Sequence, residues 1–319
     1  GYAVNSHKGY IYIRGEYNEV TAILEKALDE AYKAGLLGKN ILGSGFDFDL
    51  DIYKGAGAYI CGEETGMISS LEGKKGQPKL KPPFPAVKGY LGKPTIVNNV
   101  ETLAAVKYIV RDGADAYRKY GTEKSAGTKL FSVSGNVVKP GNYEVPLGYP
   151  LMDLINVECG GLKPGRKLKA VIPGGSSAPV LTAGECADAT MDYENLAQKG
   201  TMLGSGAVIV MDDSNCMVDM LRVIMHFYHH ESCGQCTPCR EGTGWLHKIV
   251  SSIYSGGGRL QDIDLILQVA EHMKGKTICA LSDAAALPAI SFIQKFRSEF
   301  EFYVREGRSK VKGAVDAQM

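Results

Sequence analysis

Four cysteines constrain this chain more than any other feature of its sequence. Cys233, Cys236 and Cys239 lie in the run SCGQCTPCREG with two residues between neighbours, and Cys279 follows in TICALSD after 39 intervening residues. Three closely spaced thiolates on one loop can bind three corners of an iron–sulfur cubane, and a remote fourth can complete it from another element. The spacing therefore predicts a [4Fe–4S] site that draws two distant segments together.

Zinc is the alternative, because it also binds four cysteines. Zinc sites usually contain two separate cysteine pairs, so the three-plus-one spacing favours the cluster. Gly234 and Pro238 suit a tight loop that directs amide N–H groups at cluster sulfurs. His226, His229 and His230 lie nearby. Four cysteines already satisfy the iron, so we expect these histidines on a helix surface or in packing contacts.

Composition and charge exclude several classes of protein. The 319 residues are 45% hydrophobic and 22% charged, which allows two or three domains that each bury a core. The 36 Lys and Arg balance the 35 Asp and Glu, so we expect no nucleic-acid partner. No apolar run is long enough to span a membrane and no signal-peptide pattern is present, so we expect no direct membrane insertion. We expect a reducing location, in the cytoplasm or on the inner face of a membrane complex.

An α/β pattern is expected over residues 1–126. The run YIYIRGEY at 10–17 alternates like a strand and leads directly into a helical pattern at 20–37. A second strand-like stretch, 48–54, ends in a glycine-rich turn and is followed by a short helix. Such alternation predicts a mostly parallel sheet with helices on it.

Between these elements and the rest of the chain, residues 74–95 are polar and rich in proline, which predicts a functional surface loop. A helix is predicted next, at 98–113, with Asn98 or Asn99 as its N-cap and Glu101 in its first turn.

Two further domains are expected. Short strands and turns around one helix predict a small β-grasp-like domain at 127–212. Helical periodicity dominates 213–319, which predicts a helical bundle that contains the cysteine motif.

The turn GAGAYICGEETG, residues 55–66, is the second candidate site. Its first two glycines fit the dinucleotide fingerprint, but Ile60 occupies the third position. A glycine-rich turn before a helix brings the backbone close to a phosphate or flavin, and the helix N-terminus favours an anion. Alternatively, the glycines only relieve strain in a tight turn. Glu63 and Glu64 could bind ribose hydroxyls, or they could form a solvated acidic turn stabilised by the helix dipole.

Four segments of the sequence resemble the signature segments of the flavoprotein subunit of respiratory complex I, in the order of that family. They are GAGAYICGEETGMISSLEG, LKPPFPAVKGYLGKPTIVNNVETL, ESCGQCTPCREGTGW and TICALSDAAALPAISFIQKFRSEFE. The resemblance implies a Rossmann-like flavin domain, a ubiquitin-like β-grasp domain of the soluble-ligand-binding type, and a four-helix bundle that carries the cluster. The same module occurs in NAD-linked hydrogenases and formate dehydrogenases.

The resemblance also implies an FMN site in two parts. The family begins with a further glycine-rich flavin segment and an acidic run that residues 1–319 do not contain, so we expect an incomplete flavin site in this chain. One implied part lies along the flavin and the other holds its phosphate and ribityl chain: Gly55, Gly57 and Tyr59 for the first, and Asn98, Asn99 and Thr102 for the second.

An NADH site is implied beside the flavin. Glu64 and Lys81 match positions that bind the NADH ribose, and Phe84 matches the ring that stacks on adenine. Glu63 lies on the nicotinamide side of that pocket. Without the resemblance, Phe84 is best explained as a loop anchor between two prolines.

The function implied is that of an NADH dehydrogenase subunit. Hydride passes from NADH to FMN, and single electrons then reach the [4Fe–4S] cluster, with no side chain as acid or base. The implied partners are a small thioredoxin-like [2Fe–2S] subunit and a large iron–sulfur subunit. The alternatives are the diaphorase module of a soluble hydrogenase or formate dehydrogenase, and a non-catalytic scaffold in which the cluster and β-grasp domain only mediate assembly.

Overall fold

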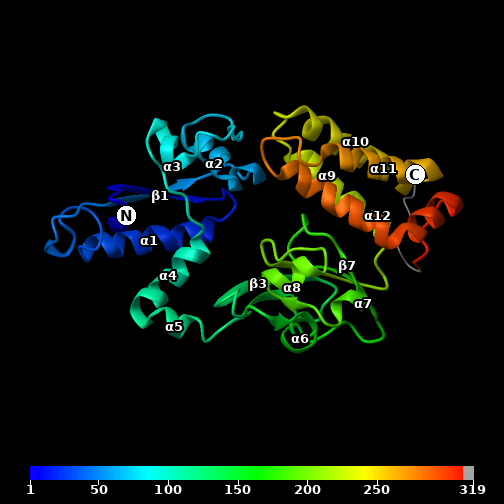
Figure 1. Cartoon of the computed structure of the whole chain (residues 1–319), viewed down its shortest axis with the longest axis horizontal. Helices are drawn as coiled ribbons and strands as arrows, with labels where there is room; N and C mark the ends of the chain where they lie inside the picture. Colours follow the sequence, from blue (N-terminus) through cyan, green and yellow to red (C-terminus); the bar gives the residue numbers. More distant parts are fainter. Residues whose placement is uncertain (312–319) are drawn as a thin grey trace. The chain divides into compact units, whose positions relative to one another are not determined.

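The computed structural model describes residues 1–311. They divide into two compact units, of which the first ends at Val97 and the second begins at Asn98 (Figure 1). The second unit contains both a five-stranded sheet and four long helices. The division into three domains made from the sequence stays a prediction.

A strand–helix–strand unit forms the start of the chain. β1 (Lys8–Ile13) and β2 (Asp49–Lys54) pair in parallel along their full length, and α1 (Asn18–Lys33) lies between them in the sequence. Parallel strands need a long crossover of this kind, because a tight hairpin joins only antiparallel strands. The predicted element order and the parallel pairing are confirmed. Two short 3₁₀ helices, η1 (Tyr2–Val4) and η2 (Ile41–Gly43), complete this part.

The glycine-rich turn follows β2 and leads through the 3₁₀ helix η3 (Tyr59–Gly62) into α2 (Glu64–Leu71). Residues 74–95, here called the 74–95 loop, contain only two short helical turns, α3 (Pro85–Lys88) and η4 (Tyr90–Gly92). Proline lacks a backbone donor and disfavours a longer helix in this run. The predicted proline-rich loop is confirmed.

Helix α4 (Val100–Asp112) begins the second unit, and α5 (Ala114–Tyr117) follows it. The side chain of Asn99 accepts a hydrogen bond from the backbone N–H of Glu101, so Asn99 is the N-cap. This residue is one of the two asparagines predicted for that role. Glu101 also forms an ion pair with Lys129 at 2.6 Å, which attaches the start of α4 to the first strand of the sheet.

The five-stranded sheet has the order β4-β3-β9-β6-β7. β3 and β9 are parallel, and the other neighbouring strands are antiparallel. Phe131, Leu151 and Leu154 are fully buried in its core. The mixed α/β character is confirmed, and the β-grasp assignment stays a prediction. The elements are β3 (Thr128–Gly135), β4 (Gly141–Pro146), β5 (Tyr149–Pro150), α6 (Leu151–Asp153), the π-helix η5 (Leu154–Glu158), β6 (Leu168–Ile172), β7 (Leu181–Thr182), α7 (Ala183–Cys186), β8 (Thr190–Met191), α8 (Tyr193–Gln198) and β9 (Ala207–Asp212).

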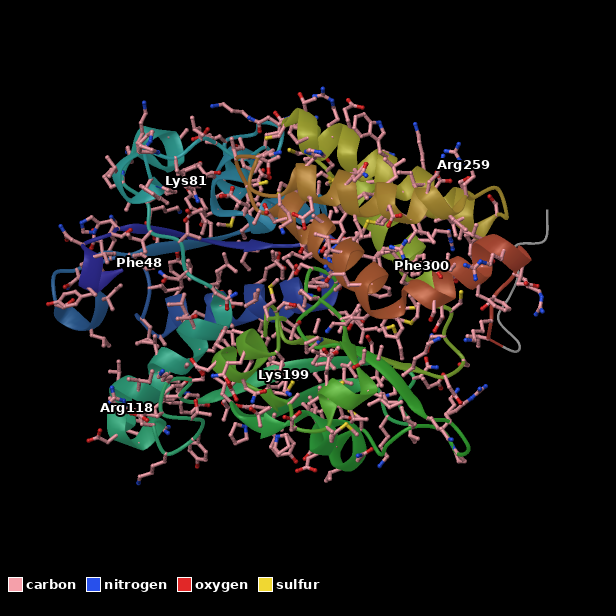
Figure 2. All side chains as sticks on the ribbon, turned by 45° about the vertical axis from the view of Figure 1, so that its right-hand side comes forward. Phe48, Lys81, Arg118, Lys199, Arg259 and Phe300 are labelled. Carbon is pink, nitrogen blue, oxygen red and sulfur yellow. The ribbon has the colours of Figure 1, made fainter. Side chains whose placement is uncertain are left out.

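Four long helices follow the sheet in the described chain, as the helical periodicity predicted. Helix α12 packs against the other three, and Tyr228, Phe292 and Phe300 are fully buried. Phe300 is labelled on α12 in Figure 2. Within residues 1–311, no helix combines the length and the apolar character that a membrane span requires. The four are α9 (Met217–Glu231), α10 (Thr237–Tyr254), α11 (Leu260–Met273) and α12 (Leu281–Glu306).

The second half of α12 is attached to the sheet region. Lys295 pairs with Glu185 at 2.8 Å, and Glu299 pairs with Lys169 at 2.7 Å. The Lys169 and Glu299 side chains are only 14% and 15% exposed, so water screens this second pair weakly. One helix therefore contacts both the bundle core and the sheet.

Candidate functional site

Helix ends carry all four predicted cluster cysteines. Cys233 follows the end of α9, Cys236 is the N-cap of α10, and Cys239 lies in the first turn of that helix. Cys279 lies just before the N-cap of α12. Helices α9, α10 and α12 pack against one another, so their ends bring the two cysteine segments together.

The pKa of Cys239 reflects both its burial and the other three cysteines. Burial raises the pKa of its thiol to about 11, and the charges of Cys279, Cys233 and Cys236 also raise it. A thiol with so high a pKa binds as thiolate only where metal charge displaces its proton. The donor set therefore fits an iron–sulfur cluster, whose irons supply that positive charge.

Ser232 is a polar neighbour of the site that the sequence analysis missed. Its hydroxyl lies 3.3 Å from the sulfur of Cys239, and it accepts a hydrogen bond of 3.4 Å from the N–H of Gly234. Gly234 has φ +79°, a conformation that side chains rarely adopt, so a tight glycine turn is needed here. The N–H of Gly234, which was predicted to point at a cluster sulfur, thus bonds to the hydroxyl of Ser232. That hydroxyl in turn contacts the sulfur of Cys239. The only signal for Ser232 in the sequence was its position beside Cys233.

The nearby histidines take part in packing, as predicted. The ring of His226 lies 5.0 Å from that of His247 on α10, and His229 stacks on His247 at 5.7 Å between centroids. His230 has a side chain that is 75% exposed, so it lies on the helix surface. His247 was not singled out from the sequence, because its neighbours belong to another helix.

The geometry of the glycine-rich turn explains both of its first glycines. Gly57 has φ +86°, and a Cβ on Gly55 would lie 2.4 Å from the hydroxyl oxygen of Tyr12. The turn therefore requires both glycines for its own backbone and packing, which agrees with the tight-turn alternative. Tyr59 follows the turn with 41% of its surface exposed. The contact of these three residues with FMN stays a prediction.

Helix α2 and the 74–95 loop together form a charged cluster. Lys81 lies 3.1 Å from a carboxylate oxygen of Glu63 and 2.5 Å from one of Glu64. The hydrogen bond to Glu64, followed by that to Glu63, raises the pKa of Lys81. The structure thus brings the two predicted ribose-binding residues together across 17 positions of sequence.

Glu63 has a structural role as well. Its Oε2 accepts hydrogen bonds from the N–H groups of Thr65 at 2.9 Å and Gly66 at 2.8 Å, so it caps α2. Burial acts to raise the pKa of Glu63, but hydrogen bonds from the Thr65 hydroxyl, the Gly66 N–H and Lys81 outweigh burial, so the pKa lies below its ordinary value. The alternative of an acidic first turn stabilised by its helix therefore applies to Glu63.

The remaining predicted residues are accessible. Phe84 is 56% exposed on the 74–95 loop, which leaves a ring face open for stacking. Asn98, Asn99 and Thr102 are exposed around the start of α4 in the second unit. Their contact with the flavin phosphate stays a prediction.

Comparison with known families assigns most of the described chain. Residues 1–108 match the Nuo51 FMN-binding domain, and residues 129–210 match the SLBB domain. Residues 219–303 match the NADH-ubiquinone oxidoreductase-F iron-sulfur binding region, which includes all four cysteines. These matches confirm FMN and a [4Fe–4S] cluster as the cofactors.

Sequence similarity to known proteins extends over nearly the whole chain. It is 51% identical over 309 residues to an F-type subunit of NADH-quinone oxidoreductase in Rhizobium meliloti (strain 1021), covering 96% of this chain and 73% of that protein. It is 50% identical over 306 residues to the F-type subunit of the same enzyme in Mycobacterium tuberculosis (strain ATCC 25618 / H37Rv), covering 96% and 68%.

A solved structure is similar in fold. The structure described as NAD+-reducing [NiFe]-hydrogenase in the H2-reduced state superposes with a TM-score of 0.84 at 36% sequence identity. The superposition covers 95% of this chain and 50% of that chain. The chain thus spans half the length of this solved relative.

Proposed function

This chain belongs to the family of F-type subunits of NADH-quinone oxidoreductase, and we propose that it takes electrons from NADH through FMN and delivers them singly to its [4Fe–4S] cluster. The observation that carries this proposal is the gathering of four cysteines at the bundle helix ends, inside the matched iron–sulfur region. When bound, FMN supplies the chemistry that accepts a hydride and releases single electrons. The side chains bind and orient, and none needs to act as acid or base in the hydride step.

The charged cluster of α2 and the 74–95 loop is proposed to bind NADH. Glu64 accepts hydrogen bonds from the ribose hydroxyls, while Lys81 donates to a ribose oxygen and keeps the carboxylates in place. Phe84 offers its exposed ring face to the adenine. Glu63 lies on the nicotinamide side, held by its own helix cap. Two carboxylates also disfavour the 2′-phosphate of NADPH, so the site selects NADH.

Two groups of residues are proposed to bind the flavin. Gly55, Gly57 and Tyr59 lie along FMN, and their turn brings the backbone close to it. The phosphate and ribityl chain bind at the N-terminus of α4, where backbone N–H groups and the helix dipole favour an anion. The side chains there are Asn98, Asn99 and Thr102.

The chain is proposed to work in a multi-subunit complex. A thioredoxin-like [2Fe–2S] subunit and a large iron–sulfur subunit are the expected neighbours, and the large one receives the electrons. The relatives are named as subunits of NADH-quinone oxidoreductases. We therefore place the chain at the periphery of such a complex, on the inner face of the membrane.

A second candidate is the diaphorase role in a soluble NAD-linked hydrogenase. It is favoured by the TM-score of 0.84 to the NAD+-reducing hydrogenase, because the same electron path can run in either direction. Nickel analysis of the purified native complex distinguishes the two functions, since only a hydrogenase contains nickel.

The test uses the native complex with and without a cluster mutation. Anaerobic NADH should reduce the flavin and produce the EPR signal of a reduced [4Fe–4S] cluster. Cys236→Ser should abolish or distort that signal, because it removes a ligand. Cys186→Ala is the matched control, since Cys186 is buried beside the sheet and outside the ligand spacing. Unchanged spectra in Cys236→Ser would contradict the assignment, and a complex that contains the cluster but no flavin would indicate the scaffold alternative.

A further inference from the structure

We propose that Glu72 is a positioning residue for NADH, because its one carboxylate anchors both ends of the loop segment that carries Lys81 and Phe84. The inference rests on the proposed NADH site. Glu72 is the C-cap of α2, at the opposite end of this helix from Glu63 and Glu64. It does not lie among the residues proposed to touch the nucleotide.

The first end of the segment is held by ion pairs. Oε2 of Glu72 lies 2.9 Å from the ammonium of Lys74 and 3.2 Å from that of Lys79. The Glu72 side chain is only 6% exposed, whereas those of Lys74 and Lys79 are 69% and 46% exposed, so the pairs are shielded from solvent at the carboxylate end only. Lys79 precedes Lys81 by two positions, which places this anchor directly before the ribose-binding lysine.

The second end is held by the other oxygen of the same carboxylate. Oε1 of Glu72 accepts a hydrogen bond of 3.0 Å from the backbone N–H of Leu91. Leu91 has φ +51°, in the left-handed region that a non-glycine residue adopts only at an energetic cost. Its side chain is exposed and gives little packing in return. The bond to Glu72 therefore helps to fix a strained return of the chain.

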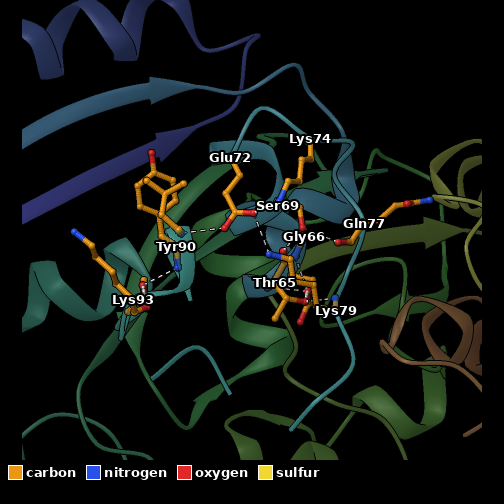
Figure 3. Close-up of polar contacts among 12 residues, drawn as sticks. Thr65, Gly66, Ser69, Glu72, Lys74, Gln77, Lys79, Tyr90 and Lys93 are labelled. Atoms are coloured by element: carbon orange, nitrogen blue, oxygen red, sulfur yellow. Dashed lines mark hydrogen bonds and ion pairs between the residues drawn. The ribbon is translucent and has the colours of Figure 1, made fainter. Parts of the chain in front are cut away.

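Helix α2 supports the same segment along its length. The hydroxyl oxygen of Thr65 accepts a hydrogen bond of 2.8 Å from the N–H of Lys79, and the hydroxyl of Ser69 donates one of 3.0 Å to the carbonyl of Gln77 (Figure 3). The loop thus runs back along α2 from its C-terminus to its N-terminus. At the N-terminus of α2, the loop places Lys81 beside Glu63 and Glu64.

Between its two ends the segment carries the residues proposed to bind NADH. Lys81 pairs with Glu63 and Glu64, and Phe84 is exposed. Fixing both ends of a loop removes part of its conformational freedom before the ligand binds. Glu72 therefore lowers the entropy cost of ordering Lys81 and Phe84 around the nucleotide.

The charge of Glu72 is stable across the working pH range. The hydrogen bonds from Lys74, Leu91 and Lys79, the first being the largest, lower the pKa of this carboxyl to about 2. Glu72 is therefore ionised at every pH at which the enzyme works, so its contribution to NADH binding has to be measured by substituting the residue.

The test compares Glu72→Gln with wild type and with Glu30→Gln in the native complex. Glu30 forms an exposed pair with Lys26 on α1, so its substitution changes the net charge equally without touching the loop. Hydrogen–deuterium exchange in peptides covering residues 79–91 should be faster in Glu72→Gln alone. The Kd for NADH should rise about tenfold, as expected from loss of charge-assisted hydrogen bonds. At saturating NADH, kcat with ferricyanide and the flavin and iron contents should stay unchanged. Glu72→Asp should recover part of the affinity.

The outcomes separate the two proposals. A wild-type complex that binds no NADH would refute the proposed function, whereas equal exchange of the loop in Glu72→Gln would refute the anchor. Faster exchange with unchanged NADH affinity would show that Glu72 stabilises the loop without positioning the ligand residues. A fall in kcat with unchanged Kd would also overturn the inference.

Discussion

Removal of the Ser232 hydroxyl should make the reduction potential of the [4Fe–4S] cluster more negative. The hydroxyl oxygen lies 3.3 Å from the sulfur of Cys239. Once that sulfur binds iron it has no proton, so Ser232 is the donor. A hydrogen bond donated to a ligand sulfur stabilises the reduced cluster more than the oxidised one, because reduction adds negative charge. Ser232→Ala removes this extra stabilisation of the reduced cluster.

The size of the shift follows from the strength of one bond. Hydrogen bonds to charged groups contribute about 1.5–3 kcal/mol, and only the difference between the two redox states affects the potential. A difference of about 1 kcal/mol corresponds to roughly 40 mV for a one-electron couple. We therefore expect the potential of Ser232→Ala to be more negative by tens of millivolts.

EPR-monitored redox titration of the native complex measures this shift. Ser232→Thr keeps the hydroxyl and should stay near the wild-type value. Ser255→Ala is the matched control, since Ser255 caps the far end of α10 and donates to Ser251 within its own helix. An intact cluster in Ser232→Ala with an unchanged or more positive potential would refute the reasoning.

Two further predictions concern the acidic groups of α2. Glu64→Gln should narrow the preference for NADH over NADPH, since it removes a charge that repels a 2′-phosphate. The ratio of kcat/KM for the two nucleotides measures this preference, and an unchanged ratio would contradict the proposed role of Glu64. Glu72 should stabilise the fold above its ordinary pKa of 4.5 and lose this contribution as the pH falls towards the folded value of about 2. Chemical denaturation should therefore show wild type more stable than Glu72→Gln by about 1 kcal/mol at pH 7, with a gap that shrinks below pH 4; a constant gap would contradict this linkage.

Features with a local cause could be predicted from the sequence. Periodicity and short-range capping determine β1, α1 and the N-cap at Asn99, because the chemistry involved lies within a few residues. Cysteine spacing predicted the cluster, since a loop with three thiolates has few other uses. Family resemblance implied that Lys81 and Glu64 both bind the NADH ribose, and the structure shows that the two side chains form an ion pair.

Contacts between distant residues could not be predicted in this way. Glu72 reads in the sequence as one more charge at the end of a helix, yet its side chain is 6% exposed and bonds to Leu91, 19 positions away. Ser232 and His247 also depend on neighbours that only the fold supplies. Glu63 shows a further limit, because the same carboxylate serves as helix cap and as partner of Lys81.

The positions of the cysteines give the cluster a mechanical consequence for the bundle. Cys239 belongs to α10 and Cys279 precedes α12, so in the proposed assignment iron and sulfide cross-link two helix ends through a closed ring of about 40 residues. By analogy with a disulfide, closing a ring of that size restricts the unfolded chain by about 4 kcal/mol. Oxidative loss of the cluster therefore removes a cross-link between the helix ends as well as an electron carrier. The loosened end of α12 belongs to the same helix whose far half pairs with Lys169 and Glu185, so damage at the iron can reach the sheet.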